Sequence, residues 1–340
     1  MVTQYRTSSA AVFKDIYVDI IDERSFNALA FVFDSQEYVG INAGVGISLT
    51  LLFLSLLSHP EVLPHLDASA EEKRPVSLDR FVLSAGKFSD LTLLDFPYSS
   101  LLHPQSDLRF HHATYLSIRA LGFLLLHEIG HIGRCHLSYL RERGLLALAS
   151  SGALALLELG QVTGDAQSVR RVLECDADSF AARAQVEALL CSPLADHAKF
   201  ALGPDSNARM KWEDVAYLWL ISVGVLFQLL ATRDKSPIAE AARTHAHPDL
   251  RFAILANFAW SSWNKVIPDP STYSSVANRA RDDLWGIWMT LNLPGSQARQ
   301  SPAYEADFKK AHLEFQKGFA AIAARLNELS MERINGTSAI

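Results

Sequence analysis

The chain has 340 residues, of which 49% are hydrophobic and 20% are charged. This composition is typical of a globular protein, and the length suits one large domain or two smaller ones. The formal net charge of −6 lacks the basic excess of proteins that bind nucleic acids, so no nucleic-acid partner is expected.

The N-terminal part of the chain combines short strands with one apolar helix. Residues 27–41 predict two strands joined by a polar turn. An apolar helix is predicted to follow and to end near Leu57. The proline-rich stretch after it is predicted to be mostly loop, with short strands at 80–84 and 91–94.

The rest of the chain is predicted to be largely helical. One long helix is expected from Phe110 to about Leu140, with Gly144 as its left-handed stop. Residues 260–275 are expected to form a loop. Further helices are predicted at 145–159, 166–190, 212–231 and 304–331, the last of them amphipathic. The expected fold class is therefore α+β, mainly α, with a small edge sheet.

One segment bears on membrane association. Residues 215–231 carry one Gln and no charge, which places them at the lower limit of a membrane-spanning helix. No basic flank marks one side only, so we expect a buried core helix, with a membrane span as the alternative. The three cysteines do not describe a disulfide framework and fit a reducing compartment. Since no signal-peptide pattern is seen, we expect a cytoplasmic protein.

The most informative motif is HEIGH, from His127 to His131. Positions four apart share a helix face, so the two imidazoles can bind one metal ion. Glu128 can reach a water bound to that metal, which is the HExxH arrangement of zinc peptidases. The alternative is a buried histidine pair with a glutamate in a salt bridge.

A catalytic zinc ion usually has three protein ligands and one open position. One known solution places the third histidine ten residues after the first, but that position is Leu137, and His136 is one residue off. The other solution is a carboxylate from a later helix. Glu174 and Asp178 are four apart, so Glu174 can bind the metal while Asp178 accepts the free ring N–H of a liganding histidine.

The residues around this second motif also bear on the packing of the two helices. The small side chains at positions 177, 181 and 182 keep the second helix thin, which allows it to approach the HExxH helix closely. Asp176 is expected to point elsewhere, into solvent.

HEIGH followed by ECDAD-SFAA resembles the gluzincin zinc peptidases of the HtpX and CAAX-prenyl-protease type, whose second motif has the form ExxAD. Residues 26–30 and 38–41 are similar to the NAFA strand of that family and the strand after it. Residues 244–251 are similar to its THP…R motif. The resemblance covers roughly residues 25–255. Soluble HExxH peptidases of the Lit and ImmA/IrrE type also pair HExxH with a downstream acidic motif.

The resemblance implies a zincin-like core, one Zn²⁺ ion and several further site residues. In the family, a histidine and an arginine line the active site, which corresponds here to Arg251 and to His245 or His247 as donors to an oxyanion. His245 has the family's spacing to the arginine, whereas His247 has its proline. The alternative for both histidines is a surface cluster at a helix start. The edge strand beside the cleft, which would pair with substrate, corresponds to Asn27, Ala28, Leu29 and Ala30.

The sequence thus predicts a zinc-dependent endopeptidase, with Glu128 as general base and a protein or peptide as substrate. Residues 1–255 are expected to form the catalytic domain, and residues 256–340 a helical extension packed on it. One alternative is a metal-stabilised regulatory or defence-associated protein with little or no turnover. Another is a membrane-integrated peptidase of the same family.

Overall fold

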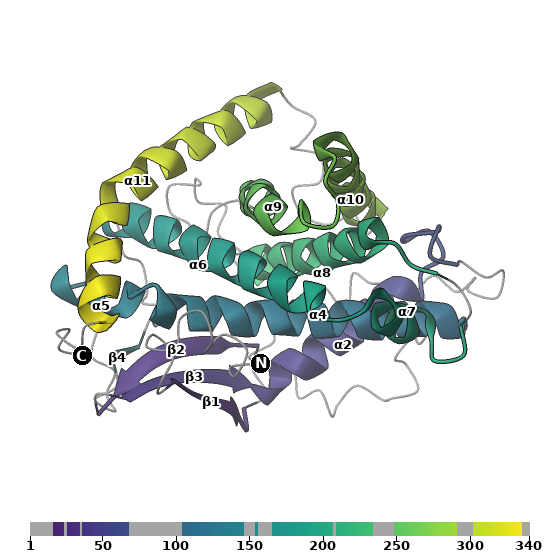
Figure 1. Cartoon of the computed structure of the whole chain (residues 1–340), viewed down its shortest axis with the longest axis horizontal. Helices are drawn as coiled ribbons and strands as arrows, with labels where there is room; N and C mark the ends of the chain where they lie inside the picture. Colours follow the sequence, from purple (N-terminus) through teal and green to yellow (C-terminus); the bar gives the residue numbers. More distant parts are fainter. Residues whose placement is uncertain are drawn as a thin grey trace.

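The computed structural model describes residues 16–23, 26–34, 36–67, 104–145, 154–155, 165–206, 209–233, 248–290 and 302–334. The described chain is mainly helical, with one small sheet, so the expected α+β, mainly α class is confirmed. The strands expected at 80–84 and 91–94 lie outside the described residues. In Figure 1 the sheet lies beneath a stack of helices that runs across the molecule.

The sheet has four strands in the order β1-β3-β2-β4. β2 (Ala28–Phe33) and β3 (Gln36–Asn42) form the expected antiparallel hairpin, and Asp34 has the positive φ of 49° that tight hairpin turns favour. β1 (Ile16–Ile21) pairs in parallel with β3, and β4 (Leu154–Ala155) pairs with the far end of β2. β4 falls where the sequence predicted a helix over 145–159, so a helix across that whole stretch is wrong.

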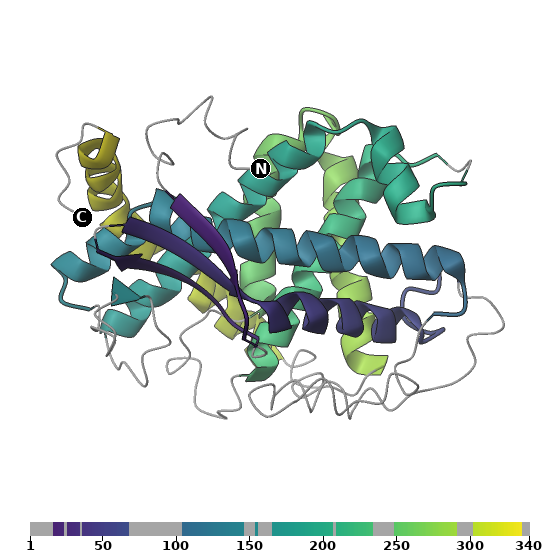
Figure 2. The same ribbon diagram turned by 90° about the horizontal axis from the view of Figure 1, so that it is seen from below.

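The long helix α4 (Asp107–Gly133) runs above the sheet, and α2 (Ala43–Leu57), which continues from the end of β3, lies alongside α4, as Figures 1 and 2 both show. The Ser106 side chain caps α4 by accepting a hydrogen bond from the Arg109 amide. The buried guanidinium of Arg109 donates to the carbonyls of Leu57, His59, Val62 and Leu63. It thereby ties the carbonyls at the end of α2 and in the turn after it to α4.

The helix that carries HEIGH ends earlier than the sequence predicts. α4 stops at Gly133, and the separate short helix α5 (His136–Glu142) begins after a break. Cys135 lies in the break with a φ of 59°, which is the left-handed region that a continuous helix does not contain. The prediction of one helix over 110–140 is therefore wrong, whereas Gly144 does follow α5 with a left-handed φ of 65°.

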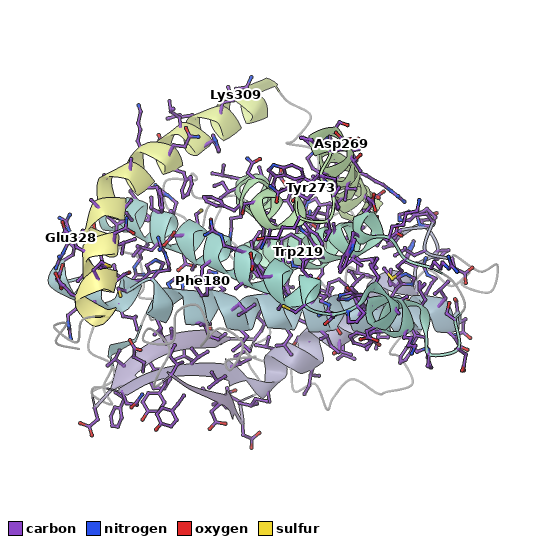
Figure 3. The ribbon with its side chains drawn as sticks, viewed as in Figure 1. Phe180, Trp219, Asp269, Tyr273, Lys309 and Glu328 are labelled. Atoms are coloured by element: carbon purple, nitrogen blue, oxygen red, sulfur yellow. The ribbon has the colours of Figure 1, made fainter. Side chains whose placement is uncertain are left out.

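α6 (Asp165–Leu190) crosses α4 at close range. The contact depends on small residues, as the sequence suggested: a Cβ atom on Gly130 would lie 3.1 Å from the Phe180 ring and 3.3 Å from the Ala177 carbonyl oxygen. Phe180 is labelled in Figure 3 between the two helices. The main chains of α4 and α6 therefore approach closely beside the HEIGH motif.

α8 (Trp212–Arg233) is the central core helix, in contact with α4, α9 (Pro248–Trp263) and α10 (Pro270–Thr290). Trp219, labelled in Figure 3, is completely buried on it. Among the described residues, one helix, Trp212–Leu230, is long and apolar enough to cross a membrane, and 83% of its most apolar window is buried inside the protein.

The C-terminal helices differ in one respect from the expectation. The loop expected at 260–275 is mostly helical, because α9 extends to Trp263 and α10 starts at Pro270. The expected domain boundary at 255 falls inside α9. α11 (Pro302–Ile334) includes the expected amphipathic helix and packs on α5, α6 and α9. The short helix α7 (Leu194–Leu202) packs on α4.

Candidate metal centre

Three side chains from two helices converge at the crossing of α4 and α6. His127 and His131 come from α4 and Glu174 from α6, and all three are buried. One ligand atom from each lies within 4.8 Å of the others. The structure therefore brings together the three residues that the i,i+4 spacings on the two helices predicted as ligands.

The spacing of the donor atoms suits a small tetrahedral ion. The two histidine Nε2 atoms are 3.1 Å apart, and Glu174 carboxylate oxygens lie 3.2 Å from His127 Nε2 and 3.7 Å from His131 Nε2. Ligand atoms about 2.0–2.1 Å from a tetrahedral zinc ion are about 3.3 Å from one another. Two imidazoles and one carboxylate are also a donor set of catalytic zinc sites, so these residues fit the ion.

His127 is oriented by an acidic residue from α6. Its Nδ1 atom lies 2.9 Å from Asp178 Oδ1, which is the contact the sequence predicts for Asp178. Arg251 of α9 donates two hydrogen bonds to the same carboxylate, at 2.7 and 2.8 Å, and its guanidinium lies over the Phe227 ring. Arg251 is thus placed behind Asp178, and the interpretation of it as an oxyanion donor has no support in this geometry.

His131 has a separate set of partners. Its Nδ1 atom lies 2.9 Å from Nδ1 of His136, and His136 Nε2 lies 3.0 Å from Asp176 Oδ2. Asp176 also accepts a hydrogen bond from Arg134 at 2.8 Å. The expectation that Asp176 points into solvent is wrong: it is 5% exposed, because the break at Cys135 places His136 and Arg134 against it.

The charges of these groups follow from their partners. Burial lowers the pKa of His127, but hydrogen bonds to Asp178 and Glu174 outweigh it and raise the pKa to about 10. Burial lowers the pKa of His131 well below its usual value. Burial would raise the pKa of Asp176, but the hydrogen bonds from His136 and Arg134 lower it to about 2. Without a metal, one imidazole of the pair is therefore charged and the other neutral.

Glu128 lies next to the ligands and touches the sheet. Its carboxylate accepts a hydrogen bond from the backbone amide of Ala30 in β2. Burial raises the pKa of Glu128 to about 7; His127 and the Ala30 amide oppose this shift, and the carboxylate of Glu174 adds to it. A carboxyl group with a pKa near neutrality is suited to both accept and donate a proton.

The segment Asn27–Ala30 runs beside Glu128. Asn42 donates to the Asn27 carbonyl, so the main-chain groups of alternate residues, including Ala28 and Ala30, point away from β3. In the described part of the chain, β4 covers that side of β2 only at Phe31 and Val32. Ala28 therefore presents main-chain groups on the same side as Ala30 and Glu128.

Two predicted residues cannot be placed, and one residue near the site, Arg170, was not predicted from the sequence. His245 and His247 lie outside the described residues. Arg170 lies one turn before Glu174 and is 5% exposed, and its buried Nη2 atom has no hydrogen-bond partner among the described residues. Its spacing of four residues from Glu174 was visible in the sequence and could have identified it.

Comparison with models of protein families, with curated proteins and with solved structures gives no match to this chain.

Proposed function

We propose that the protein is a zinc-dependent endopeptidase with a zincin-like core, in which His127, His131 and Glu174 hold one zinc ion. The observation that carries the proposal is the convergence of these donors beside a buried glutamate. When bound, zinc supplies a Lewis acid that polarises the substrate carbonyl and lowers the pKa of a water molecule. The resemblance of HEIGH and ECDAD to the gluzincin motifs points to the same class.

Glu128 is the general base in this proposal. It takes a proton from the attacking water and delivers it to the nitrogen of the leaving amine as the peptide bond breaks. Its pKa of about 7 makes both transfers feasible near neutral pH. Arg170 is the proposed donor to the oxyanion, because its guanidinium interacts electrostatically with the Glu174 carboxylate and has a buried nitrogen with no hydrogen-bond partner among the described residues.

The substrate binds as an extended strand next to Asn27–Ala30. The outward main-chain groups of Ala28 can pair with a peptide that continues the line of β4. Main-chain pairing holds a chain in place without requiring a particular sequence. This arrangement directs the peptide towards Glu128, whose carboxylate accepts a hydrogen bond from the Ala30 amide.

The variant Glu128→Gln tests the proposal, because it removes the base and keeps all three metal ligands. Zinc content should equal that of the wild type, and cleavage of a mixture of internally quenched peptides should be lost. Glu314→Gln, which changes an exposed glutamate on α11, is the matched control and should cleave normally.

Equal cleavage by the wild type and Glu128→Gln would contradict the endopeptidase proposal. A wild type that binds zinc and cleaves no peptide in the mixture would favour the alternative of a metal-stabilised protein without turnover.

A further inference from the structure

The break after α4 places His136 next to His131, a position that it could not occupy if the helix were continuous. Five residues along an unbroken helix, His136 would lie about 140° around the axis from His131. The left-handed residue Cys135 instead brings the two rings together, with their centroids 5.0 Å apart and their planes at 72°. His136 is fully buried, so its two nitrogens have only protein groups as neighbours.

The protons of this chain of contacts can be assigned from the distances. If His131 binds a metal through Nε2, which faces His127, its single proton is on Nδ1. Two nitrogens 2.9 Å apart can share only one proton, so Nδ1 of His136 is the acceptor. The proton of His136 is then on Nε2, where it is donated to the Asp176 carboxylate. Each hydrogen bond fixes the tautomer of the next ring.

We propose that His136 is a positioning residue of the metal site, which accepts the Nδ1 proton of His131 and is itself fixed by Asp176. The inference rests on the proposed function, because it concerns a residue that supports a ligand of that site. Each liganding histidine then has its own carboxylate from α6. Asp178 contacts His127 directly, whereas Asp176 is linked to His131 through the ring of His136.

Each of these carboxylates is in turn held by an arginine from another segment. Arg251 of α9 holds Asp178, and Arg134, in the break between α4 and α5, holds Asp176. Asp176 and Asp178 are two residues apart on one helix, so α6 sets the orientation of both imidazoles. Partners of this kind fix the orientation of a ligand and raise its basicity, and their loss typically costs about 10- to 100-fold in metal affinity or activity.

Two substitutions of His136 separate its two hydrogen bonds. His136→Asn keeps an acceptor close to the position of Nδ1 and loses the reach to Asp176. His136→Gln keeps a donor close to the position of Nε2 and loses the acceptor for His131. The control is His112→Asn, which changes a buried histidine of α4 whose Nδ1 contacts the Leu108 carbonyl of its own helix.

The readouts are zinc affinity, measured by competition with a chelator, and the visible spectrum of the Co²⁺-loaded protein. We expect His136→Asn and His112→Asn to stay within a few-fold of the wild type, with an unchanged Co²⁺ spectrum. His136→Gln should bind zinc about 10- to 100-fold more weakly and show a shifted spectrum. If His136 only stabilises the fold as a hydrogen-bond partner of Asp176, the order of zinc affinities is reversed: His136→Asn then binds zinc more weakly than His136→Gln.

A second pair of variants tests the break without changing a histidine. Cys135→Gly accepts the left-handed conformation and should keep zinc affinity, whereas Cys135→Val resists it and should lower the affinity. Equal affinity of all variants and the wild type would overturn the inference while leaving the proposed function intact. A wild type that binds neither Zn²⁺ nor Co²⁺ would instead overturn the proposed function.

Discussion

The pair Arg251–Asp178 allows a quantitative test of how the site is supported. Both side chains are almost completely buried, and two hydrogen bonds of 2.7 and 2.8 Å join them. Arg251→Met leaves the buried Asp178 carboxylate with His127 as its remaining cationic partner, so the loss of unfolding free energy should be at most about 3–5 kcal/mol. The lost contact with the Phe227 ring, 4.2 Å from the guanidinium, adds about 1–2 kcal/mol.

The two single variants and the double variant form a thermodynamic cycle. Asp178→Asn leaves the Arg251 guanidinium buried without its anion, so it should also cost about 3–5 kcal/mol. In the double variant neither Arg251 nor Asp178 leaves the other's charge unpaired, and the loss of the Asp178–His127 contact is common to it and to Asp178→Asn, so the loss should be smaller than the sum of the single losses by about 2–3 kcal/mol. Urea unfolding in the presence of a chelator measures these values without a contribution from bound metal.

The control for this cycle is Arg325→Met, because Arg325 on α11 also contacts several carboxylates but its side chain is 35% exposed. Its effect on unfolding should be much smaller than that of Arg251→Met. Additive effects of the Arg251 and Asp178 substitutions, or a loss below about 1 kcal/mol for Arg251→Met, would refute the reasoning.

Three further predictions follow from the site. The pKa of His127 is raised from 6.5 to about 10 in the metal-free protein, so its stabilising contribution is complete below pH 6.5 and is lost as the pH rises to about 10. The increase in melting temperature caused by zinc should therefore grow between pH 6.5 and 10, and a constant increase would contradict this. Gly130→Ala should weaken zinc binding about 10-fold, because the added Cβ would push the Ala177 main chain, and with it α6, away from α4. Its thermal stability should stay nearly unchanged, because alanine has a better helix propensity than glycine. Arg170→Met should lower kcat about 100-fold and leave zinc content unchanged, and a normal kcat would remove Arg170 from the reaction.

The predictable part of the site is the part that lies on regular helices. A spacing of four residues places His127 with His131, and Glu174 with Asp178, whatever the rest of the chain does. The apolar residues before HEIGH and the alanines after Glu174 indicated that both helices are buried. The sequence could therefore predict which residues meet once the two helices cross.

The unpredicted part depends on departures from regular structure. Cys135 adopts a left-handed conformation without being glycine or asparagine, so no residue type marks the end of α4. The break was not expected; His136 was considered only as a third ligand, one residue off the required position, and Asp176 was expected to point into solvent. Their contact arises from the fold and is not visible in either helix alone.

Two other errors have different causes. The segment Asp269-Pro270-Ser271-Thr272 was interpreted as a loop because of its composition, yet it is a helix start. Asp269, labelled in Figure 3, accepts hydrogen bonds from the amides of Ser271 and Thr272, and Pro270 takes the first helical position. β4 lies in an apolar stretch whose pattern also suits a helix. Its pairing with Val32 is a long-range contact that local periodicity does not contain.

Elemental analysis of the purified protein tests the central claim most directly, because it needs no substrate. We predict about one zinc ion per chain in the wild type and in the control variant His112→Asn, and almost none in His131→Ala. Zinc absent from the wild type after zinc is supplied, or equal zinc in the wild type and His131→Ala, would contradict the account.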